Sequence, residues 1–479
     1  MLFNSLDFAI FLPAVFILYW FVFSRNLRWQ NMLLVVASYF FYGWWDWRFL
    51  FLILFSSLLD FTIGLQMAKA KKSSQRKLLL WTSIAVNLGF LGVFKYYNFF
   101  VESFVEAFTL MGSSIRPSSL DIILPVGISF YTFQTLSYTI DVYRRKLEPT
   151  GDIVSFFAFV SFFPQLVAGP IERATNLLPQ FYTSRNFNYS LAVDGCRQIL
   201  WGLFKKVVIA DQCAHYANDI FNNSDSYSGS TLFMGALFFT FQIYGDFSGY
   251  SDIAIGTSRL FGFDLKKNFA TPYFSRNIAE FWRRWHISLS TWFRDYVYIP
   301  LGGSKGSLWM KLRNVFIIFL VSGLWHGANW TFVIWGLLNA LYFVPLMLVK
   351  RNRSYLGVVA VNSRFPTLRE LTSMSLTFLL TVFAWIFFRA DSVLGALRFI
   401  QGIFTRNLMH LPEVRPSYLI ALLFVFVLLE WSGRREDHTL ERLWVAKPRG
   451  LRWAFYMVLA AMILVFSNEE PQPFIYFQF

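Results

Sequence analysis

NVFIIFLVSGLWHGANWTFVIWGLLNALYFVPLMLV, residues Asn314–Val349, is the longest stretch of the 479-residue sequence without Asp, Glu, Lys or Arg. About 20 apolar residues cross the hydrocarbon core of a bilayer, so we expect this stretch to lie in lipid. His326 is near its middle. An ionisable residue at that depth indicates function, and an imidazole can serve as a general base. The alternative is a histidine that packs between helices and bonds a carbonyl group.

The composition of the whole chain indicates an integral membrane protein. With 56% hydrophobic, 20% aromatic and 15% charged residues, a soluble chain could not bury its apolar surface. We therefore predict an all-α polytopic membrane protein with about 11–13 transmembrane or re-entrant helices. A single membrane domain over 1–479 is expected to comprise N-terminal helices at 1–120, a catalytic core at 121–349, C-terminal helices at 350–467 and an extracytoplasmic tail at 468–479.

The net charge of +15 comes from basic residues in short loops. This pattern fits the positive-inside rule and contact with anionic membrane lipid, and it argues against nucleic-acid binding. The loop Lys69–Lys77 is the strongest cytoplasmic marker, and counting spans from it places both termini outside the cytoplasm. Cys196 and Cys213 have neither metal-ligand spacing nor a disulfide framework, so we expect no metal.

Two span-length segments carry polar residues. Leu124–Arg145 contains Pro, Gly and hydroxyl side chains, and Phe239–Phe263 contains Asp246 and Asp252 beside glycines. Irregular backbone and carboxylates at membrane depth are tolerated only against protein or a water-filled cavity. Both segments are therefore candidate linings of a central site, and the alternative is that they are interfacial loops.

The segment Arg276–Pro300 has aromatic and aliphatic residues at steps of three or four, with arginines on the other faces. This periodicity predicts an amphipathic helix in the headgroup plane. On it His286 could contact an acyl donor, orient His326 or anchor the helix. Arg283 and Arg284 could neutralise a phosphorylated donor, since Arg forms bidentate pairs with phosphate, and lipid phosphates would satisfy them equally well.

These motifs carry a family resemblance. FWRRWHISLSTWFRDYVYIPLGG (Phe281–Gly303) followed by SGLWHGANWTFVIWG (Ser322–Gly336) resembles the membrane-bound O-acyltransferase (MBOAT) superfamily, in particular the bacterial branch with the alginate O-acetylation membrane subunit. Further matching stretches are Leu124–Arg144, Ser161–Arg173, Leu203–Asp211 and Gln242–Gly256. Gly245 stands where that branch has a phenylalanine, and we expect it to loosen the wall of the site.

The resemblance implies the MBOAT fold, in which helices surround a central tunnel, and it implies a catalytic role for His326. His286 corresponds to the second marker residue of the family. The resemblance also implies acetyl-CoA as a cytoplasmic donor and a polysaccharide acceptor outside the membrane. An SGNH-hydrolase-like acetyltransferase is the implied partner, and the bacterial inner (cytoplasmic) membrane is the implied location. Asn329 is a candidate oxyanion donor, with helix packing as its alternative.

The C-terminal tail PFIYFQF, Pro473–Phe479, resembles the aromatic C-terminal motif of a companion protein in teichoic-acid D-alanylation systems. That resemblance implies that Tyr476 accepts the acyl group and relays it outward. A phenol is a weak nucleophile at its usual pKa near 10 and needs a base, for which His326 is the natural candidate. The alternative is an aromatic anchor or a peptide that docks a partner.

Together these features predict a membrane O-acyltransferase for O-acetylation of an extracytoplasmic polysaccharide. One alternative is D-alanyl transfer from a carrier protein to cell-envelope polymers. Another is a polysaccharide transporter or flippase that uses His326, Asp246 and Asp252 as a proton path. Internal repeats are common in transporters, and the two halves of this sequence show no self-similarity.

Overall fold

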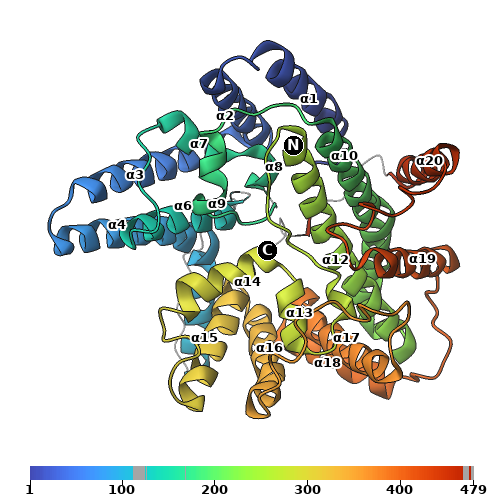
Figure 1. Cartoon of the computed structure of the whole chain (residues 1–479). Helices are drawn as coiled ribbons and strands as arrows, with labels where there is room; N and C mark the ends of the chain where they lie inside the picture. Colours follow the sequence, from blue (N-terminus) through green and yellow to red (C-terminus); the bar gives the residue numbers. More distant parts are fainter. Residues whose placement is uncertain (112–124, 126, 168, 468–473, 476–479) are drawn as a thin grey trace. The chain divides into compact units, whose positions relative to one another are not determined.

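The computed structural model of the chain describes residues 1–111, 125, 127–167, 169–467 and 474–475. Within these residues the backbone forms helices joined by loops, without a β-strand (Figure 1). The chain divides into two compact units, Met1–Ala192 with Ser258–Leu265 and Val193–Thr257 with Lys266–Phe479. The prediction of an all-α protein is confirmed.

Among the described residues, six helical stretches are long and apolar enough to cross a membrane. They are Trp47–Lys69, Ser73–Thr109, Leu308–His326, Trp330–Leu348, Leu368–Arg389 and Arg449–Phe466, and three shorter apolar helices occupy Leu6–Val22, Val393–Thr405 and Ser417–Gly433. Large apolar side chains on their outer faces are exposed, for example Leu464 at 76% and Val465 at 77%. Such a surface is stable only in lipid, which supports the prediction of a multi-pass membrane protein.

The first unit packs its helices around buried polar contacts. Its helical segments are α1 (Leu6–Ile17), η1 (Leu18–Val22), α2 (Leu27–Gly43), η2 (Trp47–Phe49), α3 (Leu50–Lys69), α4 (Ser73–Leu91), η3 (Gly92–Tyr96), α5 (Tyr97–Leu110), α6 (Ile128–Tyr143), α7 (Ile153–Ser161), α8 (Phe163–Leu166), α9 (Ala174–Leu177) and η4 (Leu178–Phe181). Helices α3, α4 and α6 lie side by side (Figure 1). Buried Asp60 of α3 joins them by accepting hydrogen bonds from Ser83, Asn87 and Thr139.

The remaining helical segments follow in chain order. They are α10 (Tyr189–Leu203), η5 (Phe204–Ala210), α11 (Asp211–Asn222), η6 (Ser224–Ser226), α12 (Gly229–Leu260), η7 (Pro272–Phe274), α13 (Ile278–Arg284), α14 (Ile287–Phe293), η8 (Arg294–Tyr298), α15 (Leu308–His326), α16 (Trp330–Leu348), α17 (Leu368–Arg389), α18 (Val393–Thr405), α19 (Ser417–Gly433) and α20 (Arg449–Phe466). Gly202 and Gly249 let α10 and α12 pack closely, because a Cβ on Gly202 would lie 2.6 Å from the Gly249 carbonyl oxygen.

The segment Phe239–Phe263 differs from the irregular backbone that its glycines and aspartates predicted. It is helical to Leu260, as part of the 32-residue helix α12. A Cβ at Gly245 would lie 3.0 Å from the Lys205 carbonyl oxygen, so this glycine permits close packing of α12 on η5. The expectation that Gly245 loosens the site is therefore wrong.

The predicted amphipathic helix over Arg276–Pro300 is also interrupted. It breaks between α13 and α14 at His286, whose φ of 43° lies in the left-handed region. The Asn268 carbonyl oxygen accepts from Ile287 N, and the Ala270 amide donates to the Arg284 carbonyl. These bonds to a neighbouring segment replace the bonds that a continuous helix would make. Sequence periodicity within a helix does not show that another segment of the chain will compete for its backbone hydrogen bonds.

Candidate active site

His326 is the last residue of α15, and a short turn leads to α16. The two helices pack closely because Gly323 and Gly336 face the opposite backbone. A Cβ at Gly323 would lie 2.3 Å from the Phe332 carbonyl oxygen. Asn329 caps α16, since its Oδ1 accepts from Thr331 N at 2.9 Å while its Nδ2 donates to the Asp391 carbonyl at 3.0 Å. The structure therefore shows Asn329 as the cap of α16, and its role as an oxyanion donor stays a prediction.

Aromatic rings surround the imidazole of His326, which is 3% exposed. The ring centroids of Trp325, Trp335 and Phe388 lie 4.9, 5.0 and 5.2 Å away, each at a steep interplanar angle. Edge-to-face packing of this kind fixes the position of a ring through its shape. His326 is therefore held in a tight apolar enclosure at the end of a membrane helix.

His286 is held instead by polar groups. Its Nδ1 lies 3.1 Å from Oδ1 of Asn268, which also accepts from the Ser288 amide at 3.2 Å and the Ser288 hydroxyl at 2.9 Å. Nδ2 of Asn268 donates to Ser251 Oγ at 3.0 Å. An amide N–H can only donate, so the Ser288 amide identifies the accepting atom of Asn268 as the oxygen. Nδ1 of His286 therefore carries a proton and donates it to Asn268.

The other ring nitrogen of His286 is consequently an acceptor. Nε2 is buried and makes no hydrogen bond within the part of the chain that the structure describes. His286 lies in the turn between α13 and α14, outside the helices long enough to span a membrane, and burial lowers its pKa to about 3. The imidazole is therefore neutral at physiological pH, with the lone pair of Nε2 available to a substrate group.

A row of aromatic rings joins the two histidines to the C-terminal tail. Trp325, which contacts His326, lies 6.0 Å from His286 between ring centroids. On its other side His286 is 4.5 Å from Phe247, and Phe247 is 5.7 Å from Phe474. The structure thus brings both predicted histidines and the start of the tail into one cluster.

The tail is also held through its backbone. The Ile475 amide donates to Oδ2 of Asp246 at 2.7 Å, and both Phe474 and Ile475 are buried. Lys206 lies 2.8 Å from the other oxygen of Asp246 and 2.9 Å from Asp211. Tyr476 itself lies outside the described residues. Phe474 and Ile475 are the described part of the tail, and they pack inside this unit.

Asp252 is likewise paired. Lys205 lies 2.5 Å from its Oδ2, and Gln198 donates to its Oδ1 at 2.9 Å. Both predicted aspartates therefore form ion pairs between α12 and η5, which satisfies buried charges that would be costly alone. Lys205 and Lys206 were not among the predicted site residues. The signal was present, since they interrupt an apolar stretch in the same way that His326 does.

The predicted donor-binding arginines have other partners. Arg283 donates to the carbonyls of Asn352 and Tyr355 at 2.9 and 2.7 Å. Arg284 pairs with Glu280 at 2.9 Å and donates to the Gly357 carbonyl at 2.8 Å. Both guanidinium groups therefore hold the loop after α16 in place. Over the described ranges no group of three or more His, Cys, Asp or Glu side chains could hold a metal ion.

The amino-acid sequence matches known proteins of one family. Residues 147–357 match MBOAT, the membrane-bound O-acyltransferase family. A Pseudomonas aeruginosa protein named probable alginate O-acetylase AlgI is 40% identical over 446 residues, which cover 91% of this chain and 82% of that protein.

Two further relatives extend the comparison. A Helicobacter pylori peptidoglycan O-acetyltransferase is 36% identical, over 88% of this chain and 83% of that protein. A Bacillus subtilis teichoic acid D-alanyltransferase is 30% identical, over 45% of this chain and 57% of that protein. The resemblance carried by the two histidine motifs is confirmed. The chain therefore belongs to the membrane-bound O-acyltransferase family and is a multi-pass membrane O-acyltransferase.

Proposed function

We propose that the protein transfers an acetyl group from cytoplasmic acetyl-CoA across the membrane for O-acetylation of an extracytoplasmic polysaccharide. The observation that carries this proposal is the aromatic row, which holds two buried histidines and the docked tail in one cluster. The extensive similarity to an alginate O-acetylase and a peptidoglycan O-acetyltransferase supports acetyl as the group and a polysaccharide as the acceptor.

In the proposed reaction His326 acts as the general base. It accepts the proton of the attacking hydroxyl group while the hydroxyl oxygen forms a bond to the thioester carbonyl carbon. The carbon–sulfur bond then breaks, and the protonated His326 returns the proton to the leaving thiolate, so that coenzyme A departs as the thiol. The single proton of the hydroxyl group goes to His326, so Nε2 of His286 accepts a hydrogen bond from the bound acyl donor and orients it, since the bond from Nδ1 to Asn268 directs its lone pair.

We further propose that the hydroxyl is that of Tyr476. Acetylation would form a phenyl ester, which passes its acetyl group to a hydroxyl of an SGNH-hydrolase-like partner outside the membrane and regenerates the phenol. The burial of Phe474 and Ile475 against α12 supports this proposal, because Tyr476 is the next residue. The proposed location is the bacterial inner membrane, where a cytoplasmic thioester and an external acceptor are both within reach.

The test uses the purified full-length protein in nanodiscs with acetyl-CoA labelled in the acetyl group. Wild type, His326→Ala and Tyr476→Phe are compared for release of coenzyme A and for label retained on the protein. Retained label that disappears in Tyr476→Phe supports the relay, and turnover that disappears in His326→Ala supports the base. Normal labelling of Tyr476→Phe contradicts the relay, and normal turnover of His326→Ala contradicts the base.

Phe474→Ala provides a matched control for the tail. It leaves the phenol of Tyr476 intact but removes the ring that packs on Phe247 and Tyr250. If the tail must dock before it is acylated, the full-length Phe474→Ala variant retains less label than wild type. A tail peptide with the same substitution, acetylated chemically, still donates its acetyl group to the partner, because that step does not need docking.

A second candidate keeps the fold and changes the donor. Similarity to a teichoic acid D-alanyltransferase over about half of this chain favours D-alanyl transfer from a carrier protein. Supplying D-alanyl carrier protein in place of acetyl-CoA distinguishes the two. In the flippase alternative, the two aspartates of the suggested proton path, Asp246 and Asp252, form ion pairs with Lys206 and Lys205.

A further inference from the structure

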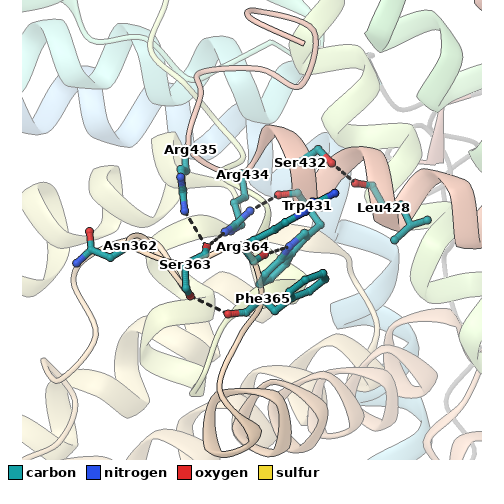
Figure 2. Close-up of a pocket in the computed structure, with 9 residues that line it drawn as sticks. All are labelled: Asn362, Ser363, Arg364, Phe365, Leu428, Trp431, Ser432, Arg434 and Arg435. Carbon is teal, nitrogen blue, oxygen red and sulfur yellow. Dashed lines mark hydrogen bonds between the residues drawn. The ribbon is translucent and has the colours of Figure 1, made fainter. Parts of the chain in front are cut away.

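A basic pocket lies where the loop after α16 meets the end of α19, away from the two histidines in the sequence. Its volume is about 570 Å³. The residues that line it are Asn362, Ser363, Arg364, Phe365, Leu428, Trp431, Ser432, Arg434 and Arg435, and Figure 2 shows them together. Three guanidinium groups and an indole therefore share one concave surface.

One of these cations is built into the pocket wall. Arg434 is 7% exposed and stacks on Trp431 at 4.0 Å (Figure 2). It donates to the Ala360 and Ser363 carbonyls at 3.0 Å each. Its acceptors are neutral carbonyl groups, so its positive charge is fixed in place without being neutralised. Such a charge in a partly desolvated wall attracts an anion.

The other two guanidinium groups are exposed. Arg435 donates through Nη2 alone, to the carbonyls of Ala360 and Ser363, and Arg364 lies over the Phe365 ring. Within the described part of the chain none of the three arginines forms an ion pair with a carboxylate, and the neighbouring Glu436 is paired with Arg442. Burial and the adjacent charge of Arg435 lower the pKa of Arg434, as expected for cations held together without a counter-ion.

The position of the pocket indicates the level of the membrane surface. Along α19 the side chains of Phe424, Val425 and Leu428 are 65%, 47% and 50% exposed, as expected for a face that contacts lipid. The arginines begin at Arg434, six residues after Leu428, which is the pattern of a helix entering the headgroup region. A ligand in the pocket would meet apolar surface on one side and guanidinium groups on the other.

We propose that this pocket binds a phosphate group, with Arg364 and Arg435 as direct ligands and Arg434 as a fixed positive charge. Guanidinium groups match the oxygen geometry of phosphate and stay charged at any physiological pH. Two sources supply this chemistry at a membrane surface, namely an anionic phospholipid headgroup and the phosphorylated nucleotide end of a soluble ligand such as coenzyme A. The proposal does not require acyl transfer, so its test measures binding alone.

The test measures binding to the full-length protein in a neutral detergent. The probes are a soluble short-chain phosphatidylglycerol, the matching zwitterionic phosphatidylcholine and adenosine 3′,5′-bisphosphate. Wild type is compared with Arg364→Gln/Arg435→Gln, which leaves Arg434 and its carbonyl contacts in place. The control variant Lys311→Gln/Arg353→Gln removes the same charge from a second basic pocket, which has a volume of about 380 Å³.

We expect phosphatidylglycerol or the bisphosphate to bind wild type and to lose affinity by about tenfold in Arg364→Gln/Arg435→Gln, with less than a twofold change in the control. Binding should weaken as salt is raised, because screening acts on exposed charges. If the double variant loses affinity for phosphatidylglycerol, the ligand is a lipid headgroup. If it loses affinity for the bisphosphate, the ligand is a nucleotide phosphate. Unchanged affinity for both probes, or equal losses in the two variants, overturns the proposal.

Discussion

His326 and His286 both contact Trp325, yet opposite kinds of chemistry hold them. Aromatic rings enclose His326 at the end of a membrane helix, whereas three hydrogen bonds converge on the Asn268 oxygen that orients His286. Packing between rings fixes where an imidazole lies through its shape. A hydrogen-bonded amide also fixes which nitrogen carries the proton. In the proposed reaction His326 transfers the proton, and His286, with its acceptor nitrogen fixed by Asn268, orients the acyl donor.

The largest expected effect is a loss of kcat on substitution of His326, and comparison with His286 tests the different roles proposed for the two histidines. His326→Ala should lower kcat by about 10²–10⁴-fold, the usual contribution of a general base, whereas His286→Ala should act more weakly and raise KM as well. Steady-state release of coenzyme A measures both parameters, and thermal unfolding in the same detergent checks that each variant is folded. Equal losses of kcat without a change in KM would contradict these different roles.

The enclosure of His326 depends on close packing of α15 against α16. Gly323→Ala places a methyl group 2.3 Å from the Phe332 carbonyl oxygen, so the helices must separate, at a cost of about 1–3 kcal/mol in the free energy of unfolding. Gly89→Ala in α4 is the matched control, because its Cβ meets nothing within 4 Å. Denaturation of the two variants should show a loss only for Gly323→Ala, accompanied by lower activity.

The orientation of His286 depends on Asn268. Asn268→Ala should lower kcat/KM by roughly tenfold, because one hydrogen bond of about 1–2 kcal/mol no longer selects the Nδ1–H form. Asn268→Asp keeps an oxygen for His286 and Ser288 and should restore part of the activity. Nitrogen NMR of the protein labelled at its five histidines reports the tautomer, and an unchanged spectrum in Asn268→Ala would refute this role.

The smallest expected effect concerns pH. With a pKa lowered to about 3, His286 should stay neutral from pH 5 to 8, so its NMR signal should not move over that range. An unfolded histidine has a pKa of about 6.5 and binds more protons than the folded one below that pH. The contribution of His286 to stability is therefore complete above pH about 6.5 and declines as pH falls towards about 3. A signal that titrates near pH 6.5 would show that the site is hydrated.

Much of the site could be read from the sequence, because it depends on local chemistry. The uncharged stretch around His326 and the motif around His286 distinguish both histidines in the sequence alone. Asn268 was missed, since a single asparagine in a loop has no distinguishing pattern. Lys205 and Lys206 were missed although they interrupt an apolar stretch, because an ion pair is recognised only when its partners in α12 are in view.

Composition and hydropathy by themselves determined that this chain is an all-α membrane protein, since the transfer of apolar residues into lipid depends on their number and order. The motifs determined the family and its two histidines. Only the tertiary structure decided that the helix over Arg276–Pro300 breaks at His286, that Asn329 is a cap and that Asp246 holds the tail. Each of these depends on hydrogen bonds between residues distant in the chain, and the order of residues does not show which distant residues come together.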